Sequence, residues 1–316
     1  LRLVGSEMCI RDRCKIKLLY EFRARVRVKT RRIMDEKILT LVKNCDLSKP
    51  LFRARSSEVF DLGDEKVLKL YFDSVSKENV DIELLNTTVA FETGCTPMEC
   101  FGKVEVNGRQ GLVFKKLYGE SLTNMPMKNP AILFKAGKII AALHTHVHST
   151  HSDKLRDVRR VALETLDNGL FTFLSAEESE KLKNYISALP EADNIIHLDF
   201  HTDNIMCDGN KYQVIDWMTA CKGRPEAELA MMHFLFHDAE LFPGSSKLKI
   251  FLMSTVRVFI YNGFIKNYVK MNKGFTKDSH KPWDVVAYVL RLGIWDIASE
   301  RELLQNKIKT EIKNIK

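Results

Sequence analysis

The sequence predicts an α+β fold in two lobes, with a small antiparallel β-sheet and one helix in the first and mainly helices in the second. Between residues 51 and 117, segments rich in apolar and β-branched residues are separated by hairpin-type turns at Gly63-Asp64-Glu65 and Asn107-Gly108. Beyond residue 117, apolar residues recur at helical spacing in almost every segment. We therefore place the hinge near residues 115–119 and the lobes at residues 34–117 and 118–316.

The first lobe is expected to open with an amphipathic helix at residues 34–45. Strands are predicted in SEVFDL, KVLKLYF, ECFGKVEV and QGLVFKKLYG, about five in all, with a helix at residues 74–93 that Gly94 ends. Lys69 lies between Leu68 and Leu70, so it points to the opposite face of its strand. Taken alone, it is more often a solvated lysine than a phosphate ligand, and Glu83 in the helix is more often an exposed acid.

The second lobe is predicted to contain helices in residues 130–148, 153–189, 226–270 and 283–315. Four residues at helical spacing in the last segment are expected in the core: Trp283, Tyr288, Leu292 and Trp295. His144 and His148 are four apart and could ligate zinc, but no carboxylate completes an HExxH motif, so a metal role is disfavoured.

The charge of the chain is concentrated at one end. Residues 1–33 contain 11 Lys or Arg and 3 Asp or Glu, and removing them from the totals of 49 and 41 leaves 38 of each sign. The balanced remainder predicts no nucleic-acid partner. We interpret residues 1–33 as a non-native or disordered basic leader; the alternative is a basic tail that binds phosphates non-specifically.

The remaining composition is that of an ordinary globular protein, with 45% hydrophobic and 28% charged residues. The seven cysteines are scattered without a CxxC pair, which excludes a disulfide framework and a zinc ribbon and predicts a cytoplasmic location. No apolar run reaches about 18 residues, so no membrane span is predicted.

Residues 195–216, IIHLDFHTDNIMCDGNKYQVID, combine two apolar strand-like runs, a polar turn and several chemically active side chains. Asp199 can orient a substrate hydroxyl, and the amide oxygen of Asn204 and the carboxylate of Asp216 can share a cation. This pattern predicts phosphoryl transfer. The same run also matches part of a metallohydrolase site, formed by His197, Asp199 and His201. That interpretation leaves three residues without a function: Lys69, Glu83 and Asp216.

The lysine, the glutamate, the HLDFHTDN run and the following VIDW resemble the aminoglycoside phosphotransferase and choline kinase family, relatives of the protein kinases. The resemblance extends from about Leu51 to the C-terminus, and it is most specific in HLDFHTDN and VIDW. It implies a bilobal protein-kinase-like fold. It also implies ATP- and Mg²⁺-dependent transfer of phosphate to a hydroxyl group of a small molecule.

The resemblance assigns the site residues position by position. Asp199 is expected to be the catalytic base, with His197 bracing its loop and with Asn204 and Asp216 as metal ligands. The residues expected to bind the nucleotide are Lys69, its ion-pair partner Glu83, and the hydroxyl residues Ser56 and Ser57.

Two positions depart from the family pattern. Ala54 replaces a usual glycine in the nucleotide loop, and Glu228 replaces a usual aspartate; we expect effects on the ATP Michaelis constant or on loop packing. The competing interpretation is a catalytically weak or inactive nucleotide-binding protein of the same fold. A protein kinase is disfavoured because GxGxxG, DFG and APE segments are absent.

The acceptor is not specified by these motifs. Residues 118–316 hold 26 basic and 24 acidic residues, so the acidic bias expected of a site for a polycationic aminoglycoside is not visible. A sugar, an amino alcohol or a nucleoside-like acceptor is at least as consistent with the sequence.

Overall fold

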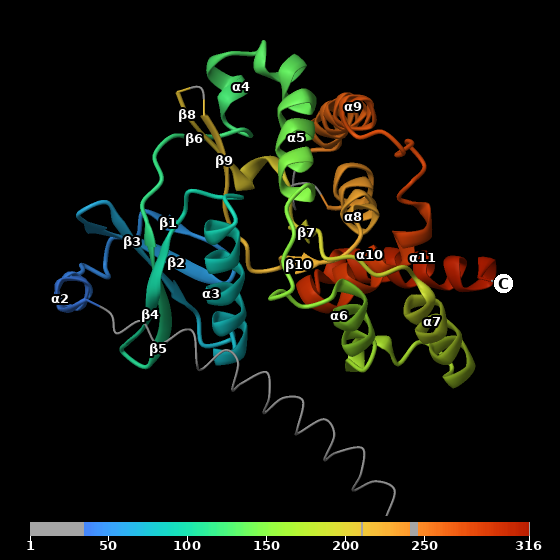
Figure 1. Ribbon diagram of the computed structural model, residues 1–316, viewed down its shortest axis with the longest axis horizontal. Helices are drawn as coiled ribbons and strands as arrows, with labels where there is room; N and C mark the ends of the chain where they lie inside the picture. Colours follow the sequence, from blue (N-terminus) through green and yellow to red (C-terminus); the bar gives the residue numbers. More distant parts are fainter. Residues whose placement is uncertain (1–34, 210, 241–245, 316) are drawn as a thin grey trace, which may run out of the picture. The chain divides into compact units, whose positions relative to one another are not determined.

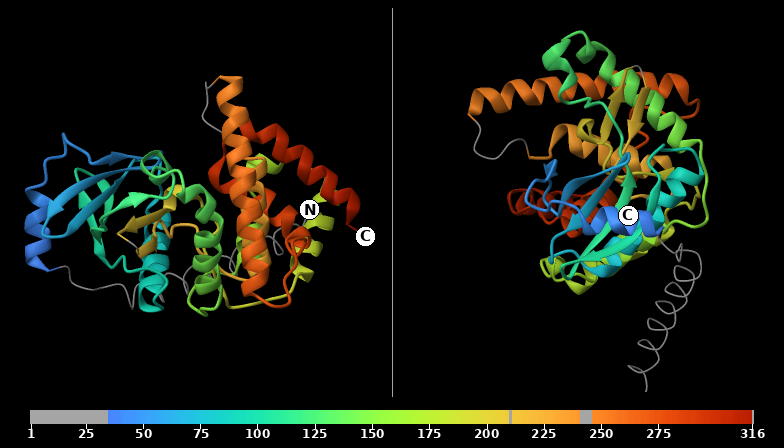
Figure 2. Two further views of the ribbon diagram at one scale, coloured as in Figure 1. Left: turned by 90° about the horizontal axis from the view of Figure 1, so that it is seen from above. Right: turned by 90° about the vertical axis from the view of Figure 1, so that its left-hand side faces the viewer.

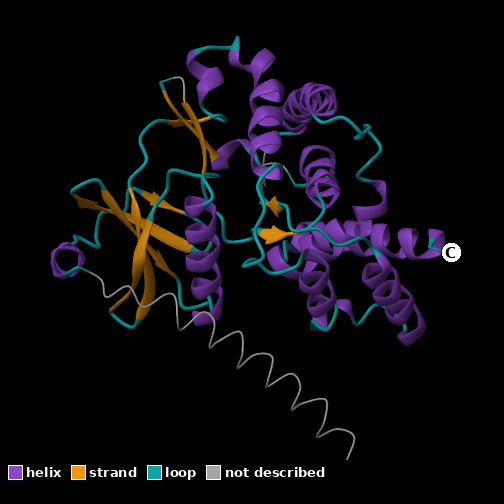
Figure 3. Cartoon of the chain, viewed as in Figure 1, coloured by secondary structure: helices purple, strands orange, loops and turns teal. Residues whose placement is uncertain are grey.

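The computed structural model describes residues 35–209, 211–240 and 246–315 (Figure 1). The predicted leader at residues 1–33 lies outside this part of the chain. The chain divides into two compact units, one formed by residues up to Thr88 together with Met98–Lys116, the other by Val89–Pro97 and Leu117 onward. Figure 3 shows the strands of the larger sheet in the first unit and most of the helices in the second.

The first unit contains a five-stranded antiparallel sheet in the order β1-β2-β3-β5-β4. Its strands are β1 (Phe52–Arg53), β2 (Ser57–Gly63), β3 (Lys66–Tyr71), β4 (Cys100–Val106) and β5 (Arg109–Lys115). Both predicted hairpins are confirmed. Asn107 and Gly108 have φ values of 51° and 80°, the left-handed conformation that a two-residue hairpin turn requires.

One helix packs on each face of this sheet. Helix α2 (Glu36–Lys43) contributes Ile38 and Val42 to a core that includes Leu68 and Leu70 of β3. On the other face, α3 (Lys77–Glu92) packs Val80 and Leu84 against residues of β3, β4 and β5. Because side chains alternate along a strand, the residues of β3 between and beyond its two leucines face α3.

The strands of the second unit are short. Strand β6 (Glu120–Ser121), β8 (Ile205–Asp208) and β9 (Lys211–Val214) form one sheet, and β7 (Ile195–Ile196) pairs with β10 (Cys221–Lys222). Of the strand-like runs predicted in residues 195–216, the parts that form strands are Ile195–Ile196, Ile205–Asp208 and Lys211–Val214. The chain leaves the strand after Ile196, because Leu198 has a φ of 66°, and the turn η2 (Thr202–Asn204) precedes β8.

Helices make up the rest of the second unit. In chain order they are α4 (Met125–Lys128), α5 (Ile132–His148), α6 (Val158–Thr165), α7 (Ala176–Ala188), α8 (Pro225–His237), α9 (Lys247–Met271), α10 (Asp284–Leu290) and α11 (Arg301–Asn314). Helices α5 and α9 lie side by side (Figure 2). A Cβ atom at Gly137 would lie 2.5 Å from the backbone N of Phe264, so a glycine is needed at this crossing.

Two predicted helices are interrupted. The segment 226–270 breaks after His237, and residues 283–315 divide at a π-helical turn, Arg291–Trp295, after which Asp296 has a φ of 45°. Trp283, Tyr288 and Leu292 are buried as expected, whereas Trp295, which follows them in the π-helical turn, is only partly buried. None of the described helices is both long enough and apolar enough to cross a membrane.

Candidate active site

The predicted lysine and glutamate of the first unit form an ion pair. Lys69 Nζ lies 2.7 Å from Glu83 Oε1, and the Glu83 side chain is 1% exposed. Tyr71, two residues along β3 and on the same face, donates a hydrogen bond of 2.6 Å from its hydroxyl to Glu83 Oε2. Both carboxylate oxygens are therefore bound. Lys69 is not a solvated strand residue, and Tyr71 is a member of this site that the motifs did not reveal.

The turn between β1 and β2 carries the predicted phosphate-binding serines. The turn is closed by a hydrogen bond of 2.8 Å from Ala54 N to Ser57 O, and Ser56 O accepts one of 2.9 Å from Phe72 N. Ser57 Oγ is buried and has no hydrogen-bond partner among the described residues, whereas Ser56 is partly exposed. The position of Ser56 suits a contact with a phosphate better than that of Ser57.

In the second unit, the backbone of the 197–204 loop is hydrogen-bonded to one buried carboxylate. Glu228 of α8 is fully buried and accepts hydrogen bonds of 2.9 Å from both His197 N and Leu198 N. The left-handed conformation of Leu198 costs about 1–2 kcal/mol in a non-glycine residue. We infer that the bonds to Glu228 offset this cost and fix the direction in which the loop leaves β7.

Helix α5 holds Glu228 from the other side. His148 Nε2 donates to Glu228 Oε2 at 2.8 Å, and His148 Nδ1 accepts from the hydroxyl of Tyr268 at 2.8 Å. Burial alone would raise the pKa of Glu228, but the hydrogen bond from His148 opposes this effect, and the pKa lies below its usual range. His144 packs face to face on Phe200 of the loop, with ring centroids 3.8 Å apart, and its burial lowers its pKa to about 3. These histidines support the loop.

His197 joins the loop to the end of β9. Its Nε2 lies 3.0 Å from the carbonyl oxygen of Ile215, which can only accept, so Nε2 carries the proton. Its Nδ1 then accepts the backbone N–H of Asp199 at 3.2 Å. Both ring nitrogens of the neutral imidazole are satisfied, and Trp217 packs edge-on against the ring with centroids 4.8 Å apart. The predicted bracing role is consistent with this geometry.

Asp199 and Asn204 are held together within the loop. Asn204 Nδ2 donates to Asp199 O at 2.9 Å and lies 3.4 Å from Asp199 Oδ2. His201 Nε2 lies 3.5 Å from the same carboxylate oxygen. Burial opposes protonation of His201, but the hydrogen bond and charge of Asp199 outweigh it and raise the pKa of His201. The loop thus holds Asp199 through two neighbours.

Asp216 directly follows Ile215, whose backbone is hydrogen-bonded to the 197–204 loop. Ile215 N donates to Asn204 O at 3.0 Å, while Ile215 O accepts from His197. Asp216 itself has a φ of 63°, which turns the chain sharply at this point. With the amide nitrogen of Asn204 turned toward Asp199, its amide oxygen remains as an acceptor. An amide and a carboxylate oxygen on adjoining segments are the hard ligands that Mg²⁺ prefers.

The comparison with known families places the chain. The family model described as "Phosphotransferase enzyme family" (APH) matches residues 53–245, more than half of the chain. The chain belongs to the phosphotransferase enzyme family. The matched segment contains every site residue predicted from the sequence. The resemblance to the aminoglycoside phosphotransferases is therefore confirmed.

Solved structures of phosphotransferases share the fold at low sequence identity. A thermostable mutant of aminoglycoside phosphotransferase APH(4)-Ia is 14% identical, with a TM-score of 0.56 over 84% of this chain and 94% of its own. Amicoumacin kinase hAmiN, in complex with AMP-PNP, Ca²⁺ and Ami, is 13% identical, with a TM-score of 0.55 over 91% and 95%. The predicted protein-kinase-like fold is confirmed. A search of curated proteins finds no match.

Glu228 is the main residue of this candidate site whose importance the sequence did not reveal. It was noted only as a departure from the family's usual aspartate, yet it organises the loop that carries Asp199. The sequence did contain a signal for this role. Glu228 lies near the start of an apolar helix, and a carboxylate that is buried there needs hydrogen-bond donors. The partners are backbone groups 30 and 31 residues earlier in the chain, which no local pattern indicates.

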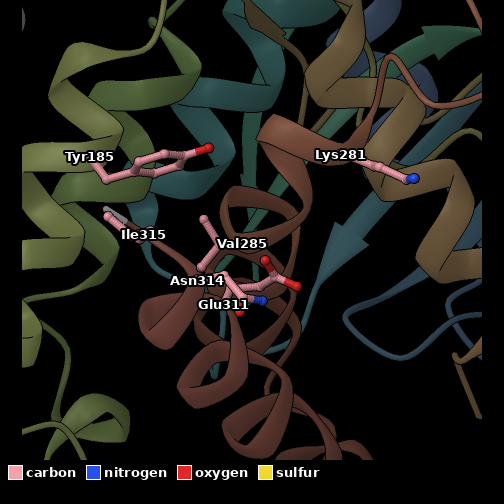
Figure 4. Close-up of a pocket in the computed structure, with 6 residues that line it drawn as sticks. All are labelled: Tyr185, Lys281, Val285, Glu311, Asn314 and Ile315. Atoms are coloured by element: carbon pink, nitrogen blue, oxygen red, sulfur yellow. The ribbon is translucent and has the colours of Figure 1, made fainter.

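The second unit also contains a small cavity of about 80 Å³ outside this group of residues (Figure 4). Its lining comes from α7, α10, α11 and adjoining turns: Tyr185, Lys281, Val285, Glu311, Asn314 and Ile315. None of the predicted site residues lines it, and it is too small for a nucleotide or a drug-sized acceptor.

Proposed function

We propose that this member of the phosphotransferase enzyme family is an ATP- and Mg²⁺-dependent kinase that phosphorylates a hydroxyl group of a small molecule. The observation that carries the proposal is the hydrogen-bonded 197–204 loop. In this loop Asn204 is hydrogen-bonded to Asp199. The loop is also hydrogen-bonded to the backbone of Ile215, the residue that precedes Asp216. A carboxylate next to an amide and a second carboxylate is the set that phosphoryl transfer uses for its nucleophile and its metal.

In the proposed reaction the acceptor oxygen attacks the γ-phosphorus, the bond to the β-phosphate oxygen breaks, and ADP leaves. Asp199 orients the acceptor hydroxyl and takes its proton. The transition state is loose and needs little covalent assistance, so the protein contributes alignment and charge neutralisation. A loop fixed by Glu228 and His197 is suited to that task because it holds the base in one position.

The remaining residues bind the nucleotide and its metal. Lys69 contacts the α- and β-phosphates. Glu83 holds the ammonium group of Lys69 in position, and Tyr71 in turn holds the carboxylate of Glu83. Asn204 and Asp216 hold Mg²⁺, which neutralises charge on the phosphates when bound. Backbone N–H groups and the Ser56 hydroxyl in the β1–β2 turn donate to the phosphates, with Ser57 as a further candidate.

The chemical class of the acceptor is inferred from two related structures and from the charge of the second lobe. One structure similar to this chain holds AMP-PNP and hygromycin B, and another holds AMP-PNP and Ami; both acceptors are small molecules. The second lobe of this chain has no acidic excess, so we favour a metabolite such as a sugar, an amino alcohol or a nucleoside over a polycationic antibiotic.

The test is a panel of hydroxyl-bearing small molecules incubated with the full chain, Mg²⁺ and either ATP or GTP. Release of the nucleoside diphosphate and the mass of the product are measured together. Acceptor-dependent release with a phosphorylated product supports the proposal. If ATP raises the melting temperature but no acceptor is turned over, the inactive nucleotide-binding protein becomes the better interpretation.

A further inference from the structure

Away from the residues used above, two histidines and an aspartate meet where three elements of the second unit converge. His233 comes from α8, His280 precedes the turn η3 (Lys281–Trp283), and Asp284 begins α10. One potential ligand atom from each lies within 4.8 Å of the others. All nine histidines of the chain lie in its described part, and there this is the one group of three that could hold a metal ion.

Two polar atoms of this region have no partner within the described residues. They are His233 Nδ1 and the hydroxyl oxygen of Tyr261 in α9, both buried. The Tyr261 ring lies edge-on to His233, with centroids 5.6 Å apart. Buried polar atoms in proteins are nearly always hydrogen-bonded, so both atoms are suited to contact a bound ion or its water ligand. His233 therefore belongs to the ligand set and also carries a buried nitrogen without a protein partner among the described residues.

We propose that His233, His280 and Asp284 bind a first-row transition-metal ion, with Zn²⁺ as the ion that fits the set best. Imidazole and carboxylate ligands suit Zn²⁺, and three protein ligands leave a fourth tetrahedral position for water. The set differs in kind from the amide and carboxylate oxygens expected to hold Mg²⁺.

The surroundings of His233 and the contact between His280 and Asp284 both suit a metal ion. A histidine must be neutral to ligate a metal. Burial, with His280 and His237 as neighbours, lowers the pKa of His233 to about 4, so its ring is neutral at physiological pH. His280 Nδ1 lies 2.7 Å from Asp284 Oδ1, so these two ligand atoms are already adjacent, and the proton between them is released when the ion binds. No proton has to leave His233 before the ion binds.

Binding requires a local adjustment of ring orientation. The His233 and His280 rings are stacked nearly parallel, with centroids 4.3 Å apart and an angle of 16°. Metal–nitrogen bonds of about 2.0–2.1 Å in a tetrahedral site bring ligand atoms to roughly 3.3 Å from each other. The rings must therefore turn about χ2, a broad torsion for histidine, so that both lone pairs point at one ion.

A bound ion would restrain α8 at a point beyond the turn that holds the 197–204 loop. His233 lies five residues after Glu228 on this helix, so an ion that ties His233 to η3 and α10 also restrains the helix that holds the loop. This role is independent of the proposed kinase reaction, and the ion takes no part in phosphoryl transfer.

The experiment uses the full chain, freed of metal by chelation and dialysis, without nucleotide or Mg²⁺. Zinc binding is measured by competition with a chromophoric chelator, and Co²⁺ is added in parallel because its visible absorption reports coordination. We expect one Zn²⁺ per chain, a rise in melting temperature, and a Co²⁺ spectrum of a four-coordinate site. His280→Asn and Asp284→Asn should each weaken binding at least about tenfold.

The matched control is His151→Asn. His151 and Asp193 form a similar pair at 2.8 Å, but both are exposed and have no third ligand. This variant should bind zinc as the wild type does. The melting temperature of each metal-free variant shows whether it is folded, and two independent variants guard against one that is not. Absence of binding in the wild type, or equal affinity in His280→Asn, Asp284→Asn and wild type, would overturn the proposal.

Discussion

Substitution of Glu228 by glutamine tests whether one buried carboxylate holds the 197–204 loop. The change keeps the size of the side chain but replaces one oxygen by an NH₂ group, which cannot accept a hydrogen bond. Glu228 Oε1 accepts from Leu198 N, and Oε2 accepts from His197 N and His148 Nε2. Whichever way the amide lies, at least one buried N–H then faces another N–H.

The magnitude follows from these contacts. A hydrogen bond to a charged group contributes about 1.5–3 kcal/mol, and a buried donor left without a partner costs about 1–3 kcal/mol more. Loss of one bond and one unsatisfied donor therefore predicts a destabilisation of about 2.5–6 kcal/mol. The usual cost of removing one partner from a buried charged pair, about 3–5 kcal/mol, lies within that range.

The assay is equilibrium urea unfolding followed by tryptophan fluorescence. The three tryptophans lie in the second unit, and Trp217 packs on His197, so the signal reports the part of the chain that Glu228 supports. The control is Glu226→Gln in the same helix turn, because Glu226 binds Arg224 rather than the loop and should cost less than about 1 kcal/mol. Equal stability of the two variants would refute the role assigned to Glu228.

Three further outcomes are expected. Lys69→Met should lower kcat/KM for ATP by at least about tenfold, whereas Lys103→Met, which breaks an equally short ion pair elsewhere on the first unit, should leave it within about twofold. Tyr71→Phe removes the hydrogen bond to Glu83 Oε2 and should raise the KM for ATP about fivefold, with a smaller change in kcat. Since the pKa of His201 is raised, its charged form stabilises the fold below the unfolded value of 6.5, and this contribution is lost as the pH rises through the folded pKa. Melting curves of His201→Asn between pH 5 and about 8 should lack that part of the pH dependence.

The features that the sequence predicted well are those decided by neighbours in the chain. The hairpin at Asn107-Gly108 formed because its residues tolerate positive φ. Lys69 faces α3 because strand side chains alternate, and its spacing from Glu83 then allowed the ion pair. The HLDFHTDN run is specific enough that its residues could be assigned to one loop before the structure was described.

The features that it missed depend on distant partners. The first strand-like run ends after Ile196, where the backbone N–H groups of His197 and Leu198 donate to Glu228 on a distant helix. The break of the last helical segment at the π-helical turn places Arg291 in a buried pair with Glu300, at 2.7 Å. Neither arrangement is visible in local periodicity, because tertiary contacts override it.

The measurement that most directly tests the central claim is the turnover of Asp199→Asn with an acceptor identified from the panel. The asparagine keeps the shape of the side chain but cannot take the proton of the hydroxyl, so turnover should fall by about 10²–10⁴-fold. The affinity for ATP, measured by titration, should stay within about threefold. Asp203→Asn, an exposed position in the same loop, serves as the control and should retain full activity. Turnover of Asp199→Asn at the wild-type rate would contradict the assignment of Asp199 as the catalytic base.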